Sequence, residues 1–262
     1  MSVAYFDLPA PFADSKRINH ALFGAYYEED IYDRACAALP LLARGLWWRM
    51  PQAMRRRKLI FVHVPRVAGM SIVRALYGRG CIRHFSMRYY RAIDPAFAAQ
   101  AESFALLRDP VDRFASAYAF VRNGGTQASR LSDVFAAQTA HIASVDDYLS
   151  FLEERSDLDL DFVMRPQSWF VCGEDGAVLV KRLFLYGQDR LALGSFLKSH
   201  GIEVLPWLNR TERTELRLTP RQLGRIERLY ASDFALIKSV RALRRPAENR
   251  EPWSEAIRIA AE

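Results

Sequence analysis

The sequence predicts an α/β fold in which helices cover a mainly parallel sheet. Two apolar runs, 58–63 and 103–107, have the length and residue types of buried strands. Each run leads into a turn and then a helical pattern, and a third strand-like run follows at 178–185. Strands that alternate with helices in this way are typical of folds with a parallel sheet.

Length and composition favour one main domain with two appendages. The chain has 262 residues, and half of them are hydrophobic, which is enough for one substantial core. We expect an N-terminal extension at 1–57, the main domain at 58–245 and a C-terminal tail at 246–262. The formal net charge of +7 fits anionic partners such as nucleotides, acidic glycans, nucleic acid or an anionic membrane. Because the arginines are spread along the chain, nucleic acid is the least favoured of these.

The cysteine pattern predicts neither a metal site nor a disulfide framework. Cys36, Cys81 and Cys172 lie far apart, without the paired spacing of zinc ligands. A reducing compartment is therefore expected. The first thirty residues lack the continuous apolar core of a signal peptide, so we expect a cytoplasmic protein.

The stretch 35–58 has two interpretations. It joins an apolar segment containing Trp47 and Trp48 to a basic run that ends at Lys58. Such a segment can lie on the cytoplasmic face of a membrane, or it can be a helix docked on the domain with a solvated basic turn. Pro40 and Arg44 interrupt the apolar part, which is too short to span a bilayer.

Turn and cap signals divide the rest of the chain into helices. The first helix is predicted at 70–77 with Gly78 at its end, and the second begins after Asp109, with Pro110 as its first residue. The interval 129–161 is predicted to be largely helical, with a cap at Ser144. A further helix is expected from 187 to 201, and one long final helix from 219 to 244.

The turn after the first strand has the features of an anion-binding loop. It carries one cation, Arg66, a glycine, Gly69, and one hydroxyl, Ser71, just where a helix begins. Backbone N–H groups at such a helix start, together with the helix dipole, favour phosphate or sulfate. The loop is not a Walker A motif, because Val64 stands where that motif requires its first glycine and Met70 where it requires lysine.

The second strand-to-helix junction repeats this layout. Arg108 follows the strand directly, and Ser116 lies two helical turns further on. Ligands of open α/β sheets bind beyond the carboxyl ends of the strands. Two such junctions predict a ligand with two anionic ends. The alternatives are a surface Arg108 paired with a nearby carboxylate and a small Ser116 chosen for close helix packing.

The two junctions together resemble the signature motifs of a known enzyme family. His63-Val-Pro-Arg-Val-Ala-Gly-Met-Ser-Ile72 and Leu107-Arg-Asp-Pro-Val-Asp-Arg-Phe-Ala-Ser-Ala-Tyr118 are similar to the two nucleotide-binding motifs of sulfotransferases that use 3′-phosphoadenosine 5′-phosphosulfate (PAPS). The similarity is greatest to the carbohydrate and membrane-associated branch and its bacterial relatives. The segments 165–170, 205–213 and 226–234 also resemble that family, so the likeness covers about residues 58–240.

The resemblance implies a P-loop-like sulfotransferase fold with three layers. It also implies that PAPS is the sulfuryl donor and a carbohydrate or glycolipid hydroxyl, or an amine, the acceptor, and that no metal is needed. The residues that match the first motif, expected to hold the 5′-phosphosulfate, are Arg66, Val67, Ala68, Gly69, Met70 and Ser71. Arg108 and Ser116 match the positions that hold the 3′-phosphate. Arg66 is then expected to stabilise the leaving oxygen, and His84, between the motifs, is the candidate general base.

The sequence departs from the family pattern at two positions. Arg66 replaces a lysine and Met70 replaces a threonine or serine. Arginine keeps the charge but has a different shape and hydration. Two functions therefore remain open: a sulfotransferase, and a protein that keeps the fold and binds the nucleotide or a sulfated glycan without turnover. A P-loop kinase and a nucleic-acid-binding protein are less favoured alternatives.

Overall fold

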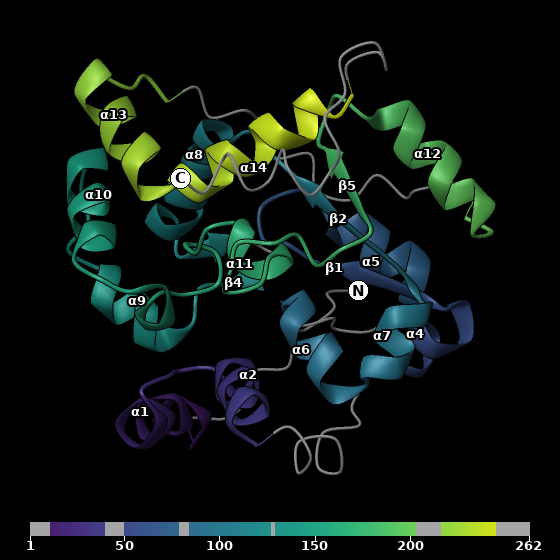
Figure 1. Ribbon diagram of the computed structural model, residues 1–262. Coiled ribbons are helices and arrows are strands. Elements are labelled where there is room, and N and C mark those ends of the chain that lie inside the picture. The colour runs from purple at the N-terminus through teal and green to yellow at the C-terminus, as the bar shows by residue number, and fades with distance from the viewer. Residues whose placement is uncertain (1–10, 40–49, 79–83, 127–128, 203–215, 245–262) are drawn as a thin grey trace.

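The core of the molecule is a small parallel sheet flanked by helices. The computed structural model describes residues 11–39, 50–78, 84–126, 129–202 and 216–244 (Figure 1). Strands β1 (Leu59–Val62), β2 (Glu102–Leu107) and β5 (Arg182–Leu185) pair in the order β1-β2-β5, all parallel. Val62 pairs with Ala105 and Leu107 with Leu185, so the three carboxyl ends meet at one edge. The predicted α/β class with a parallel sheet is confirmed.

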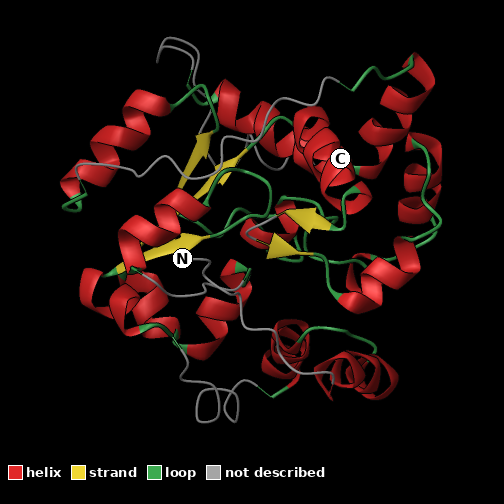
Figure 2. Ribbon diagram, turned by 180° about the vertical axis from the view of Figure 1, so that it is seen from behind, coloured by secondary structure: helices red, strands yellow, loops and turns green. Residues whose placement is uncertain are grey.

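The strands are buried because helices cover both of their faces. All four residues of β1 are fully buried, as are five of the six residues of β2, which explains why the two strands are continuous apolar runs. Aromatic rings extend this core from one strand to the next: Phe61 stacks on Phe104, whose ring meets Phe196 edge-on. The views in Figures 1 and 2 show helices on either side of the sheet.

The described helices are these, in chain order: α1 (Pro11–Phe23), α2 (Glu28–Ala38), α4 (Gln52–Arg57), α5 (Met70–Tyr77), α6 (Met87–Ile93), α7 (Pro95–Gln100), α8 (Pro110–Arg122), α9 (Asp133–Thr139), α10 (Val145–Glu153), the 3₁₀ turn Asp157–Asp159, α11 (Ser168–Val171), α12 (Arg190–Ser199), α13 (Pro220–Leu229) and α14 (Ala231–Ala242). The predicted helix at 70–77 and its end at Gly78 are confirmed. So are the caps: Asp109 accepts from the N–H groups of Val111 and Asp112 at the start of α8, and Ser144 forms a capping box with Asp147 at the start of α10.

Three predicted elements are wrong in extent. The interval 129–161 does contain α9, α10 and the 3₁₀ turn, but its first two residues form β4 (Ser129–Arg130), which pairs with β3 (Gly125–Thr126) in a small hairpin. The third strand begins only at Arg182, because the N–H of Lys181 is bound by the Ser103 hydroxyl instead of a ladder partner. The long final helix breaks at Tyr230, whose hydroxyl donates to the carbonyl of Met164 at 2.8 Å.

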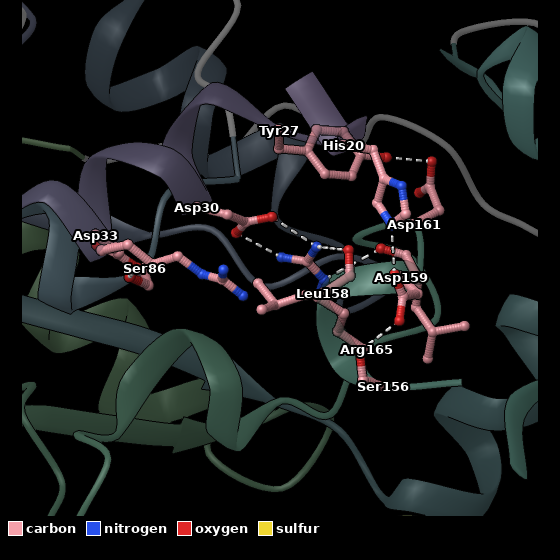
Figure 3. A network of polar contacts seen from close by, with 12 residues as sticks. His20, Tyr27, Asp30, Asp33, Ser86, Ser156, Leu158, Asp159, Asp161 and Arg165 are labelled. Atoms are coloured by element: carbon pink, nitrogen blue, oxygen red, sulfur yellow. Dashed lines mark hydrogen bonds and ion pairs between the residues drawn. The ribbon is translucent and has the colours of Figure 1, made fainter. Parts of the chain in front are cut away.

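Helices α1 (Pro11–Phe23) and α2 (Glu28–Ala38) pack on the segment 156–165 (Figure 3). Asp30 of α2 forms a bidentate ion pair with Arg165, with both N–O distances 2.8 Å and the side chains 2% and 0% exposed. The Tyr27 hydroxyl donates to Asp161 at 2.6 Å, and its ring stacks on Phe162. The described part of the N-terminal region therefore shares a buried interface with the rest of the chain, while the boundary at residue 57 stays a prediction.

Some expectations concern residues outside this description. They include most of the apolar segment proposed for a membrane surface, 40–49, the loop 205–213, the tail 246–262 and Cys81. Cys36 and Cys172 are buried free thiols. Within the described ranges, no helix combines the length and the apolar character needed to cross a bilayer.

Candidate anion-binding site

The loop between β1 and α5 has an unusual backbone. Arg66 and Ala68 have positive φ angles of 67° and 63°, a conformation that costs a residue with a Cβ about 1–2 kcal/mol. Gly69 precedes α5, and a Cβ there would lie 2.2 Å from the imidazole of His63, so only glycine fits. The N-cap residue of α5 is Gly69, and no side-chain hydrogen bond caps this helix start. This geometry suits an anion.

Residues of the two junctions contact each other directly. The Arg66 guanidinium donates from Nε and Nη2 to the Ser116 hydroxyl at 3.1 and 2.9 Å. The Arg108 Nη1 lies 3.5 Å from the backbone oxygen of Arg66. The structure thus brings Arg66, Arg108 and Ser116 together.

A third guanidinium joins this cluster. Arg113, on α8, is 1% exposed and donates to the carbonyl oxygens of Pro65 and Val163. Within the part of the chain that the structure describes, none of Arg66, Arg108 and Arg113 forms an ion pair with a carboxylate. Burial raises the pKa of the Asp233 carboxyl group, and Arg113 is close enough for its charge to oppose that rise. Three guanidinium groups at one edge of the sheet, none of them in an ion pair among the described residues, favour a bound anion.

The electrostatics of Arg66 reflect this crowding. Burial, followed by the charges of Arg108 and Arg113, lowers the pKa of Arg66 to about 10. Its guanidinium also lies over the ring of Phe120 at 4.9 Å. In Arg108, Nε is buried and has no hydrogen-bond partner among the described residues. The site therefore contains positive charge and at least one donor that protein groups leave unused.

The other predicted loop residues lie along the same turn. Val67 and Gly69 are buried, Ala68 is exposed, and Met70 and Ser71 are half-buried in the first turn of α5. Val67 contributes to the hydrophobic core, so it can offer a ligand only its backbone. Ser71 lies in the first turn of α5, beside the loop.

His84 lies against this loop. Its Nδ1 is 2.7 Å from the carbonyl oxygen of His63, and the two imidazole rings are 4.4 Å apart. A carbonyl oxygen only accepts, so Nδ1 carries the proton and Nε2 of the neutral ring keeps its lone pair. Burial lowers the pKa of His84, and the charge of Arg113 lowers it further. The hydrogen bond to His63 and the charge of Asp161 raise it, but the net shift is downward. The ring is thus neutral at pH 7, as a general base must be.

His63 has a structural position beside the loop. It is 4% exposed, and burial lowers its pKa well below the usual range. Its ring fills the space that a side chain at residue 69 would need. The buried His63 ring therefore restricts the shape of the loop at Gly69.

A cavity beside Arg108 was not foreseen from the sequence. It has a volume of about 280 Å³, close to the lower end of small-molecule pockets, and lies at the carboxyl ends of β2 and β5. Its lining includes Arg108, Asp112, Tyr186, Gln188 and Arg241. The sequence feature that could have predicted this cavity is the end of the third strand at Leu185, because the residues that follow parallel strands lie at one edge of the sheet. Arg113 was also missed as a member of the site, although it belongs to the second motif.

Among the described residues, no cluster of three or more His, Cys, Asp or Glu side chains could hold a metal ion. No protein-family model, curated protein or solved structure matches the chain. The resemblance to sulfotransferases therefore rests on the two motifs, the three further segments and their order along the chain.

Proposed function

We propose that the protein is a PAPS-dependent sulfotransferase with a carbohydrate or glycolipid acceptor. The observation that carries the proposal is the cluster of Arg66, Arg108 and Arg113, none of which forms an ion pair with a carboxylate in the described ranges. It lies where two strand-to-helix loops meet, and both loops match the motifs quoted above. A small ligand with two anionic groups provides the missing negative charge. The three-layer, P-loop-like form of the α/β fold is part of this proposal.

The residues present fit the donor nucleotide. The turn 66–71 offers backbone donors and the Ser71 hydroxyl to the 5′-phosphosulfate. Arg108 and Ser116 offer a guanidinium and a hydroxyl to the 3′-phosphate. The adjoining cavity at Arg108 and Tyr186 gives room for the nucleoside. Bound there, PAPS supplies a sulfuryl group that is already activated for transfer.

The protein groups then have distinct tasks. The cations balance negative charge on the leaving nucleotide, as in phosphoryl transfer. The Nε2 of His84 takes the proton of the acceptor hydroxyl, because Nδ1 is committed to the His63 carbonyl. The acceptor class comes from the resemblance alone. A cytoplasmic location, with or without contact to the membrane face, also remains a proposal.

A second candidate function follows from the orientation of Arg66. Nε and Nη2 of its guanidinium both donate to the Ser116 hydroxyl, toward the second loop. A guanidinium held there binds an anion well but need not reach a leaving oxygen. This arrangement favours a protein that binds PAP or PAPS without turnover. An Arg66→Lys variant that gains transfer activity, starting from an inactive wild type, would support it.

Calorimetric titration with 3′-phosphoadenosine 5′-phosphate (PAP) tests the nucleotide site. We expect Arg108→Ala to weaken binding at least tenfold, since it removes a charge-assisted contact to a phosphate. Arg182→Ala is the matched control, because that exposed arginine pairs with Glu102 on the sheet. Equal affinity in wild type and Arg108→Ala would rule out the nucleotide assignment. Incubation with PAPS and a glycan panel then separates the two candidate functions.

A further inference from the structure

The backbone of Arg108 is held by one side chain, that of Gln167. The N–H of Arg108 donates to Gln167 Oε1 at 2.8 Å, and Gln167 Nε2 donates to the carbonyl oxygen of Arg108 at 2.8 Å. A single amide thus satisfies both backbone groups of the residue that follows β2. It imitates one residue of a neighbouring strand at the point where the sheet ends.

Gln167 is itself fixed from two directions. Its backbone N–H donates to Asp233 Oδ2 at 2.9 Å, and the N–H of Ser168 donates to Oδ1 at 2.8 Å. Both Gln167 and Asp233 are 0% exposed. Two residues earlier, Arg165 makes the buried ion pair with Asp30. The segment 165–168 is therefore tied to α14 on one side and to α2 on the other.

These bonds have a direct bearing on the anion site. Arg108 sits immediately after the strand, where rotation about its backbone would move the guanidinium. The guanidinium now lies near the Arg66 carbonyl and over the ring of Tyr186. Among the described residues, both hydrogen bonds of the Gln167 side-chain amide go to the backbone of Arg108.

We propose that Gln167 is a positioning residue, which aims the Arg108 guanidinium at its anionic ligand by fixing the Arg108 backbone. Asp233 completes the arrangement by fixing Gln167. The inference rests on the proposed nucleotide site for its functional consequence, but the clamp itself can be measured without any ligand.

Gln167→Met tests the proposal, because methionine has a similar length and neither donates nor accepts in this way. We expect it to weaken PAP binding about tenfold in the wild-type background. In the Arg108→Ala background the same change is expected to alter affinity less than twofold. Affinity within twofold of wild type, or an equal loss in both backgrounds, would overturn the proposal.

Tyr230→Phe is the matched control. It removes another buried hydrogen bond to this part of the chain, from Tyr230 to the carbonyl of Met164, without touching Arg108. We expect its PAP affinity to stay within twofold of wild type. A loss as large as that of Gln167→Met would show that loosening this region is enough, which contradicts a specific clamp.

Amide hydrogen exchange separates this inference from the nucleotide assignment. We expect the Arg108 amide to exchange at least tenfold faster in Gln167→Met than in wild type and Tyr230→Phe. An unchanged exchange rate of the Arg108 amide in Gln167→Met would refute the clamp, whether or not PAP binds. Wild-type protein that binds no PAP would refute the nucleotide site, and faster exchange would then still confirm that Gln167 holds Arg108. If Gln167→Met does not fold, Gln167→Leu takes its place, because leucine also has no group that can bind the Arg108 backbone.

Discussion

Removal of the Asp30 carboxylate is expected to destabilise the whole domain. Asp30→Ala takes both acceptors from Arg165, whose guanidinium is then left in the interior with the carbonyl oxygens of Leu160 and Leu158 at 3.2 and 3.4 Å. Breaking one partner of a buried pair typically costs about 3–5 kcal/mol. For a chain of this size that corresponds to a fall in Tm of roughly 6–20 °C.

Urea unfolding gives the free energy directly. Trp169 reports on the site, because the Arg165 guanidinium lies 4.7 Å from its ring, and circular dichroism reports on the helices. Asp159→Ala is the matched control: it removes a partly exposed pair with His20 that joins the same two parts of the chain. We expect that control to cost about 1 kcal/mol or less.

Two results would refute this reasoning. A loss below about 1 kcal/mol in Asp30→Ala would show that the ion pair contributes no more than a surface pair. A loss of about 3–5 kcal/mol in Asp159→Ala, as large as that expected for Asp30→Ala, would show that any disturbance of the N-terminal helices has the same effect. Replacing both partners, as Asp30→Leu with Arg165→Met, is expected to recover part of the stability, because no unpaired charge then remains buried.

Three further predictions concern single residues. Gly69→Ala is expected to cost about 1–3 kcal/mol in urea unfolding, because its Cβ would meet the His63 ring at 2.2 Å, and an unchanged midpoint would contradict the close packing. An NMR titration of His84 is expected to give a midpoint below 6.5, so that a His84-dependent rate is flat from pH 7 to 8; a midpoint above 6.5 would argue against a buried base. Burial raises the pKa of Asp33 to about 6, so the native state binds a proton more tightly than the unfolded chain and loses stability as pH rises from about 4 to 6. Asp33→Asn removes this loss, and its stability relative to wild type is expected to rise by up to about 3 kcal/mol across that range, whereas parallel pH curves would contradict the shift.

Local signals in the sequence were enough to predict the helices and strands that surround the anion site. The apolar run of β1, the glycine that ends α5 and the Asp109-Pro110 start of α8 each act over a few residues, and the structure has all of them. The meeting of the two loops followed from a general rule for parallel strands. These features needed no knowledge of distant partners.

The features that the sequence could not reveal depend on distant pairs. Gln167 lies 59 residues from the backbone that it clamps, and no periodicity connects the two. The final helix breaks at Tyr230 although the apolar stripe continues, because the Tyr230 hydroxyl binds the carbonyl of Met164, 66 residues earlier. Local propensity is a weak guide wherever tertiary contacts of this kind decide the outcome.

The ion pair between Asp30 and Arg165 has a consequence for synthesis on the ribosome. The partners are 135 residues apart, and at about 5–20 residues per second the ribosome needs roughly 7–27 s to make the intervening chain. During that interval α2 can already meet α6, and α1 can meet α9, but Asp30 has no Arg165 to pair with. A nascent chain stalled before residue 165 therefore holds the Asp30 carboxylate without its buried partner, and this interface is completed only when Arg165 emerges.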